Sequence, residues 1–287
     1  MKHLIIGYGY SAYYLAHHLL ENRQEVTALS RHQSMPLLPG LKHQSHDVQQ
    51  GLTVEEKDTV LYYFIPPSSH GPEDKLLQQF LKEAHLSVSK VIYCSTSGVY
   101  GDHQGAWVDE QSPCLIQSDR QLRRLDAEKQ WQAFCQQQNI PCLILRLAGI
   151  YGPHRLPTAS ALQQVPLIKP DEAPFSNHIY VRDLAKILAA LGEEKNDQSL
   201  TLNIADGEPD KMGELQRLTA ELLQVPSAPY LPFRQIWQTA SEMKREFMSA
   251  SRRLLIDRLK ATLPEIIPLT PLREAIAASL EYERSSQ

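Results

Sequence analysis

Two glycines near the start of the chain stand where a phosphate-binding turn needs them. The short apolar run Leu4–Ile6 is followed by Gly7 and Gly9, and Ala12 completes a GxGxxA pattern at the start of a helical stretch. In such a turn the first glycine permits the bend, the second lets a diphosphate approach the backbone, and the small third residue lets helix and strand pack closely. The helix N-terminus then offers unpaired N–H groups to the phosphates. We expect this turn to bind a dinucleotide, the alternative being a glycine turn without a ligand.

The end of the next predicted strand, residues 25–29, indicates which dinucleotide fits. NAD-binding proteins commonly have Asp or Glu there to accept from the ribose 2′-hydroxyl, whereas a nearby arginine accommodates the 2′-phosphate of NADP. This chain has Ser30, Arg31 and His32 and no acid. Because a guanidinium binds phosphate through a fork of two hydrogen bonds, the sequence favours NADP as cofactor over NAD. The alternative is that Arg31 is a solvated loop residue.

Strands and helices alternate in the part of the chain that must position these residues. The expected strands, each a largely apolar run, are residues 4–6, 25–29, 58–65, 90–94, 141–147 and 200–204. The expected helices are residues 12–22, 75–85, 118–138 and 184–191. Continuous apolar strands alternating with helices indicate a parallel sheet covered on both faces, and right-handed crossovers make it doubly wound. The predicted fold class is therefore α/β, a Rossmann-type doubly wound parallel sheet with a smaller C-terminal, mostly helical substrate lobe.

Domain boundaries follow from a change in composition after Gly152. The next segment is rich in proline and lacks sheet periodicity, and from Glu208 the pattern is helical and interrupted by prolines. We expect an NAD(P)-binding Rossmann domain at residues 1–152, to which 179–205 return. Residues 153–178 and 206–287 would form the smaller lobe, closing over the open end of the sheet.

Composition excludes several classes of protein. The 287 residues carry a formal net charge of -4, so no global field attracts nucleic acid. No apolar run approaches the ~20 residues of a membrane span, and the start of the chain lacks signal-peptide features, so a cytoplasmic protein is expected. The four cysteines show no metal-type CxxC spacing, which predicts reduced thiols, with Cys94 buried in a strand, and no metal site.

Five short motifs occur in a characteristic order along the chain. They are Gly7–Gly9, Asp47–Val48, Ser95–Gly101, Arg146–Pro153 and Val181–Leu184. In these motifs the chain resembles, across nearly its full length, the extended short-chain dehydrogenase/reductase superfamily, the NAD-dependent epimerase/dehydratase group. The resemblance implies that Asp47 and Val48 contact the adenine and that Tyr151–Pro153 lie beside the nicotinamide. The predicted cofactor-binding residues are Gly7, Gly9, Tyr10, Ser11, Ala12, Ser30, Arg31, Asp47, Val48, Ile65, Pro66, Ser95, Gly149 and Tyr151.

The same resemblance implies one catalytic residue and shows where the chain departs from the family's catalytic motif. Thr96 stands where the family has a Ser or Thr that hydrogen-bonds the reacting substrate oxygen, although it would also serve as the cap of a strand end. The family's catalytic Tyr and Lys, spaced as YxxxK, are replaced by Arg120 and Arg124, a pattern that resembles the atypical branch of the superfamily. A guanidinium has no proton to exchange at working pH, so Arg120 cannot act as the acid or base.

Arg124 keeps a charge for hydrogen bonds to a ribose and is expected to pair with Glu128 four residues later. Both arginines would suit an anionic substrate, or they form a solvated basic face on an amphipathic helix. Tyr180 replaces the histidine that the family usually has before the Val-x-Asp-Leu segment, and Asp183 is expected to anchor a loop or a helix start.

Two functions from different classes remain open. The first is an NAD(P)-dependent oxidoreductase or epimerase/dehydratase-like protein acting on a small hydroxyl or carbonyl, sugar-like substrate, with Tyr100 or Tyr151 as the replacement proton donor. The second is a non-catalytic NADP-binding redox sensor or regulatory protein. A small-molecule substrate is the expected partner, with no nucleic acid and no membrane. Extended members of the superfamily often pair through helices like residues 118–138, so the resemblance is compatible with a homodimer, and the sequence leaves the oligomeric state open.

Overall fold

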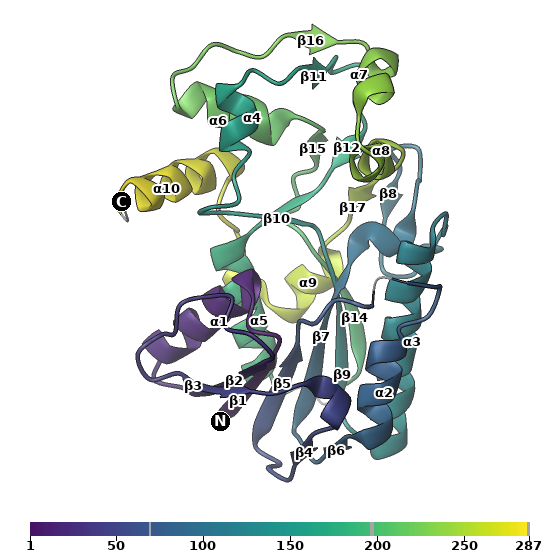
Figure 1. Ribbon diagram of the computed structural model, residues 1–287, viewed down its shortest axis with the longest axis vertical. Coiled ribbons are helices and arrows are strands. Elements are labelled where there is room, and N and C mark those ends of the chain that lie inside the picture. The colour runs from purple at the N-terminus through teal and green to yellow at the C-terminus, as the bar shows by residue number, and fades with distance from the viewer. Residues whose placement is uncertain (69, 196–197, 286–287) are drawn as a thin grey trace.

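A parallel sheet of seven strands forms the centre of the computed structural model, which describes residues 1–68, 70–195 and 198–285 (Figure 1). In spatial order the strands are β3 (Lys42–Ser45), β2 (Glu25–Ser30), β1 (Lys2–Ile6), β5 (Thr59–Tyr63), β7 (Lys90–Thr96), β9 (Cys142–Leu147) and β14 (Leu200–Ile204). Every neighbouring pair is parallel. The chain moves outward from β1 in both directions, so the strand order reverses between β1 and β5. Ligands of doubly wound sheets bind outside the carboxyl ends of the strands at such a point.

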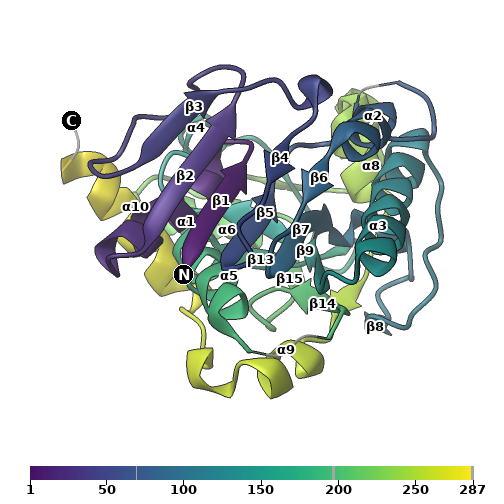
Figure 2. The same cartoon turned by 90° about the horizontal axis from the view of Figure 1, so that it is seen from below.

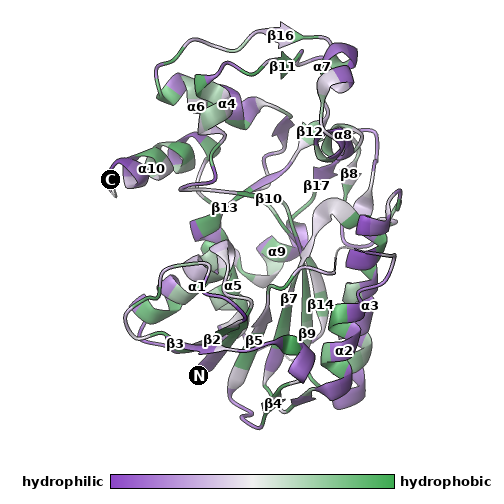
Figure 3. Cartoon of the chain, viewed as in Figure 1, coloured by the Kyte–Doolittle hydropathy of each residue, from purple (hydrophilic) through white to green (hydrophobic). Residues whose placement is uncertain are grey.

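Helices cover both faces of this sheet (Figure 2). One face carries α1 (Tyr10–Glu21) and α5 (Val181–Glu193), and the other carries α2 (Lys75–Glu83) and α3 (Asp119–Gln138). Successive strand residues point to opposite faces: in β1, Ile5 packs on the α1 side, while Leu4 and Ile6 pack on the α2 side. The central strands are accordingly hydrophobic along their length, and polar residues lie on the outer surfaces of α2 and α3 (Figure 3). This two-sided burial confirms the predicted fold class.

Two predicted elements end two residues earlier than expected. The helix expected over 75–85 ends at Glu83, because His85–Leu86 form the short strand β6, which pairs with β4 (Thr53–Val54). The strand expected over 58–65 ends at Tyr63, and the residues that follow line a cavity. The edge strand β3 was not expected at all, because its residues are polar and largely exposed, and such a strand has no apolar period.

A smaller lobe lies above the carboxyl edge of the sheet in Figure 1. Its helices are α4 (Thr158–Leu162), α6 (Glu214–Leu222), α7 (Phe233–Thr239), α8 (Glu242–Met248) and α10 (Leu272–Ser285). The short strands are β8 (Trp107–Val108), β10 (Gly149–Tyr151), β11 (Leu167–Ile168), β12 (Phe175–Ser176), β13 (His178–Tyr180), β15 (Asp210–Lys211), β16 (Tyr230–Leu231) and β17 (Arg253–Leu254). Four single-turn or near-single-turn segments complete the element order: η1 (Val48–Gln50), η2 (Ser97–Tyr100), α9 (Asp257–Thr262) and η3 (Pro264–Ile266).

An apolar cluster of side chains from α1 and α10 packs the smaller lobe against a helix that covers the sheet. Tyr14 of α1 packs there with Ala275, Ile276 and Leu280 of α10.

Within the segments expected to divide the chain into two domains, residues 196–197 and 286–287 lie outside the described residues. In the described parts of the chain, no helix combines the length and apolar character needed to cross a bilayer. The cysteines are free thiols, and Cys94 is buried in β7 as expected.

Candidate functional site

A cavity of about 420 Å³ lies at the carboxyl ends of β1, β2 and β5, where α1 begins. We name it the glycine-turn cavity. Its lining residues are Gly7, Tyr8, Gly9, Tyr10, Ser11, Ala12, Ser30, Arg31, His32, Ser34, His46, Asp47, Val48, Phe64, Ile65, Pro66, Leu76 and Arg155. It occupies the point at which the strand order reverses, which is where a doubly wound sheet offers a ligand site.

The two glycines of the turn serve different purposes. Gly7 has φ +97°, and a Cβ added there would lie 3.0 Å from Cγ1 and 3.1 Å from the backbone nitrogen of Ile65, so the fold itself requires this glycine. Gly9 has an ordinary φ of -106°, and an added Cβ would meet nothing within 4 Å. That Cβ would instead take up open space at the start of α1, a helix with no side-chain cap and no acidic residue in its first turn. The space and the unpaired N–H groups fit a diphosphate.

Eleven of the fourteen predicted cofactor residues line this cavity. Ser95, Gly149 and Tyr151 do not. Ser95 is buried and donates a 2.5 Å hydrogen bond to Glu128 Oε1, Gly149 lines a second cavity, and Tyr151 is 1% exposed in the apolar cluster that joins α1 and α10. The structure therefore brings eleven of the expected cofactor residues together and separates Ser95, Gly149 and Tyr151 from them.

The region expected to select between NAD and NADP carries basic side chains. Arg31 and His32 line the cavity, and Ser30 Oγ donates to His32 O at 3.0 Å while lying 2.9 Å from His43 Nε2 on β3. Asp47 is the one carboxylate among the described residues that line it, and its Oδ1 accepts from Gln49 N at 3.0 Å as the cap of η1. The end of β2 thus lacks an acid positioned for a ribose 2′-hydroxyl.

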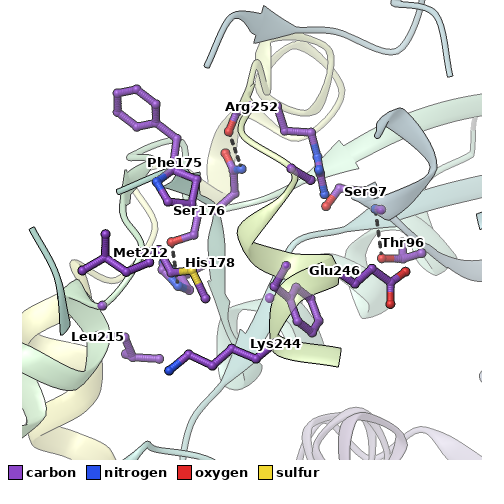
Figure 4. A pocket seen from close by; sticks show the side chains of 18 of the residues that line it. Thr96, Ser97, Phe175, Ser176, His178, Met212, Leu215, Lys244, Glu246 and Arg252 are labelled. Atoms are coloured by element: carbon purple, nitrogen blue, oxygen red, sulfur yellow. Dashed lines mark hydrogen bonds between the residues drawn. The ribbon is translucent and has the colours of Figure 1, made fainter. Parts of the chain in front are cut away.

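A second cavity, of about 450 Å³, lies between the carboxyl edge of the sheet and the smaller lobe (Figure 4). We name it the interlobe cavity. Its lining residues are Thr96, Ser97, Gly98, Arg120, Gln121, Arg124, Gly149, Pro157, Pro166, Leu167, Ile168, Pro174, Phe175, Ser176, Asn177, His178, Met212, Gly213, Leu215, Gln216, Lys244, Glu246, Phe247, Ala250 and Arg252. Figure 4 shows Thr96, Ser97 and Glu246 on one side, and Ser176 and His178 on the other.

The charges around the interlobe cavity are predominantly positive. The described residues of its lining include one carboxylate, that of Glu246, and four cations: Arg120, Arg124, Lys244 and Arg252. Arg120 Nη1 lies 2.9 Å from Glu246 Oε2, so this ion pair joins α3 to α8 across the two lobes. Such a lining suits an anionic small molecule.

Thr96, the last residue of β7, is an expected catalytic residue and lines the interlobe cavity. Its Oγ1 accepts a hydrogen bond from Gly98 N at 3.1 Å and caps η2. The expected capping role is therefore present. Because Oγ1 is the acceptor in that bond, its own hydrogen is still available to a group in the cavity.

Tyr100 and Tyr151, expected as replacement proton donors, line neither cavity. Tyr100 is fully buried and donates to Asn203 Oδ1 at 2.7 Å, and burial raises its pKa to about 12. Burial also raises the pKa of Tyr151, whose ring packs against Tyr180. Both hydroxyls are thus held in the protonated form inside the protein, away from the cavity that a substrate would enter.

The expected pair between Arg124 and Glu128 is wrong. Glu128 is 1% exposed and pairs with Arg146 of β9, whose Nη2 lies 2.9 Å from Oε2, while Ser95 bonds the other oxygen. A buried carboxylate needs a buried cation, and the sheet supplies one beneath α3. Arg124 instead lines the interlobe cavity. The anchoring role of Asp183 is confirmed: it is 2% exposed and accepts from Thr270 N at 2.7 Å.

Several lining residues were not identified from the sequence. His178, Lys244, Glu246 and Arg252 reach the interlobe cavity from segments without a recognisable motif, so no local signal marks them. Burial lowers the pKa of His178 to about 4, so its imidazole is neutral at pH 7. Arg155 lines the glycine-turn cavity and does have a signal, because it closely follows the Tyr151–Pro153 segment that the resemblance associates with the cofactor.

Comparison with known proteins gives a family match over part of the chain and a fold for the whole of it. Residues 75–205 match the NAD dependent epimerase/dehydratase family. Over 155 residues the chain is 30% identical to the uncharacterized UDP-glucose epimerase YtcB of Bacillus subtilis (strain 168), a match covering 51% of this chain and 48% of that protein. The match therefore spans about half the length of this relative.

Solved structures resemble the whole chain. A functionally unknown conserved protein from Silicibacter pomeroyi DSS is 29% identical, with a TM-score of 0.80 and 98% of each chain covered. UDP-glucuronic acid 4-epimerase from Bacillus cereus, solved in complex with NAD, is 20% identical, with a TM-score of 0.76 and 99% of each chain covered. The sequence match to the NAD dependent epimerase/dehydratase family thus covers residues 75–205, and the fold of the whole chain is the one found in the B. cereus epimerase.

Proposed function

We propose that this protein binds NADP, or NAD less tightly, in the glycine-turn cavity and acts on an anionic, sugar-like substrate in the interlobe cavity as an oxidoreductase or epimerase. The observation that carries the proposal is the gathering of eleven predicted cofactor residues around one cavity at the switch point of the sheet. The substrate cavity lies at the same edge, beside Thr96 and Gly149.

Cofactor preference rests on the residues at the end of β2. Arg31 and His32 line the cavity where the ribose 2′ substituent would lie, and Ser30 adds a hydroxyl. An arginine fork favours a 2′-phosphate, and the missing acid removes the usual partner of a free 2′-hydroxyl. The B. cereus structure contains NAD, so binding of both dinucleotides must be compared directly in this chain.

The substrate class follows from the positive lining of the interlobe cavity. Four cationic side chains and one carboxylate favour a ligand with phosphate or carboxylate groups. Two of the similar proteins are named as epimerases of UDP-sugars, which carry a diphosphate. A nucleoside-diphosphate sugar therefore fits both the charge of this lining and the family.

We assign the chain's own residues roles in binding and orienting the substrate. A bound nicotinamide would supply hydride acceptance or donation. Thr96 would donate a hydrogen bond from its hydroxyl to the reacting oxygen of the substrate, since its Oγ1 already accepts one from Gly98 N. Arg120 and Arg124 would hold the anionic groups, and Arg120 would exchange Glu246 for them. We assign Tyr100 and Tyr151 structural roles.

A non-catalytic NADP-binding sensor is the second candidate. It is favoured by the absence of tyrosine from the described residues that line the interlobe cavity, since no such side chain replaces the family's acid/base there. In that case the interlobe cavity would bind an anionic effector without turnover.

Calorimetry with NAD and NADP tests the cofactor part of the proposal. We expect NADP to bind more tightly than NAD, and Arg31→Ala to weaken NADP roughly ten-fold with little effect on NAD, because the lost charge-assisted hydrogen bonds are worth about 1.5 kcal/mol. Equal affinities for the two dinucleotides in the wild type would remove the argument from Ser30 and Arg31.

Turnover distinguishes the two candidate functions. Purified protein is incubated with NAD(P) and a panel of UDP- and dTDP-sugars, and epimerised or oxidised products are quantified. For an enzyme, Thr96→Val should lower the rate at least roughly ten-fold while Thr96→Ser retains it, because one substrate hydrogen bond is lost. Tight cofactor binding without turnover on any sugar would favour the sensor.

A further inference from the structure

The segment that enters the smaller lobe places an arginine at the start of α1. Arg155 lines the glycine-turn cavity together with Gly9, Tyr10 and Ser11. Its guanidinium lies 4.1 Å from the centre of the Tyr10 ring, and Tyr10 is the first residue of α1. Among the described residues, no carboxylate forms an ion pair with Arg155. A cation is thus held over the helix end at which a diphosphate is expected.

The turn that carries Arg155 is fixed at several points. Arg155 N donates to Gly152 O at 2.9 Å, and Tyr10 Oη donates to Pro153 O at 2.8 Å. On the other side, His154 N donates to Glu283 Oε1 of α10 at 2.5 Å. At Gly152 a Cβ would lie 2.6 Å from Val181 Cγ1 and 2.8 Å from Tyr10 Oη, so the backbone comes close to both side chains. The guanidinium is held in advance of ligand binding.

The position of Arg155 distinguishes it from Arg31, the other arginine of the cavity. Arg31 follows β2, where the ribose 2′ substituent would lie, whereas Arg155 lies over the first residue of α1. A phosphate at the helix start belongs equally to NAD and NADP, while the 2′-phosphate belongs to NADP alone. The two arginines should therefore contact different phosphates of one ligand.

We propose that Arg155 binds the diphosphate of the dinucleotide, closing the glycine-turn cavity from the side of the smaller lobe while Tyr10 supports its guanidinium. This inference rests on the proposed cofactor site. It adds a side-chain phosphate ligand to a site otherwise formed by backbone N–H groups, and it makes the entry to the smaller lobe part of the cofactor site.

Calorimetry with matched ligands tests the assignment, using Arg155→Ala and, as the matched control, Arg31→Ala. The ligands are NAD, NADP, ADP-ribose, which keeps the diphosphate without the nicotinamide, and adenosine, which has no phosphate. We expect Arg155→Ala to weaken NAD, NADP and ADP-ribose alike by roughly ten-fold and to leave adenosine unchanged, because a charge-assisted phosphate contact is lost. Arg31→Ala should weaken NADP alone.

Two results would overturn the assignment. The first is a dissociation constant of Arg155→Ala for NAD and ADP-ribose within two-fold of the wild type. The second is an equal loss of adenosine binding, which would indicate a damaged cavity and not a lost phosphate contact. A wild-type protein that bound no dinucleotide would refute the proposed cofactor site itself, so the two failures are distinguishable.

Discussion

The glycine-turn cavity and the interlobe cavity lie at the same edge of one sheet, but they are built differently. The first is formed mainly by short segments that directly follow β1, β2 and β5, and its shape depends on backbone at Gly7 and Gly9. The second is assembled from α3, α8 and several loops far apart in the sequence, and charged side chains give it its character. The shape of the glycine-turn cavity therefore depends on backbone geometry, whereas the lining of the interlobe cavity depends on tertiary packing.

The two cavities therefore depend on different features of the sequence. A diphosphate is bound largely through N–H groups, which every residue type but proline provides, so the turn depends on where side chains are absent. The interlobe cavity depends on which side chains are present. Arg120 and Arg124 of α3 belong to that lining.

The largest expected effect is a loss of stability when the buried ion pair between α3 and β9 is broken. Glu128→Ala would leave the Arg146 charge buried without its partner, which should destabilise the protein by about 3–5 kcal/mol. Urea denaturation measures the loss. The matched control is Arg120→Ala, which breaks the half-exposed pair with Glu246 and should cost less than about 1 kcal/mol. Similar costs for the two variants would contradict the view that α3 is held by its buried pair.

The next largest effect is expected at the glycine-turn cavity, where one substitution should weaken ligand binding and leave the stability of the fold almost unchanged. Gly9→Val should weaken dinucleotide binding by at least roughly a hundred-fold, about 2.7 kcal/mol, because its side chain would fill the space for the diphosphate. Thermal melting should change little, since φ at Gly9 is ordinary and an added Cβ meets no atom within 4 Å. Calorimetry measures the affinity. Unchanged affinity in a folded variant would show that no phosphate lies there.

The smallest of these effects is a pH dependence within the interlobe cavity. Because burial lowers the pKa of His178 to about 4, its contribution to stability is complete above pH 6.5 and is lost as the pH falls through 4. His178→Gln should reduce the acid destabilisation between pH 7.5 and pH 4 by on the order of 1–3 kcal/mol. Urea midpoints at the two pH values measure it, with the exposed His17→Gln as control. An identical pH slope in wild type and His178→Gln would argue against a buried neutral imidazole.

Much of the sheet could be predicted because its strands are buried on both faces and therefore read as continuous apolar runs. Strand β3 has no such signal, since Lys42–Ser45 are polar and the strand lies at the edge. The partner of Glu128 was misassigned for a related reason. Helical spacing proposes Arg124, but burial of the carboxylate against β9 makes Arg146 the partner, and burial is not a local property.

The sequence by itself determined the glycine turn, the alternation that makes the sheet parallel, and the basic end of β2. Each of these depends on residues close together in the chain, and each is fixed by backbone sterics or by periodicity. Only the tertiary structure decided that Tyr100 and Tyr151 are buried away from the cavities and that Arg155 reaches the start of α1. Such side-chain positions depend on contacts between segments more than a hundred residues apart, and no local pattern specifies them.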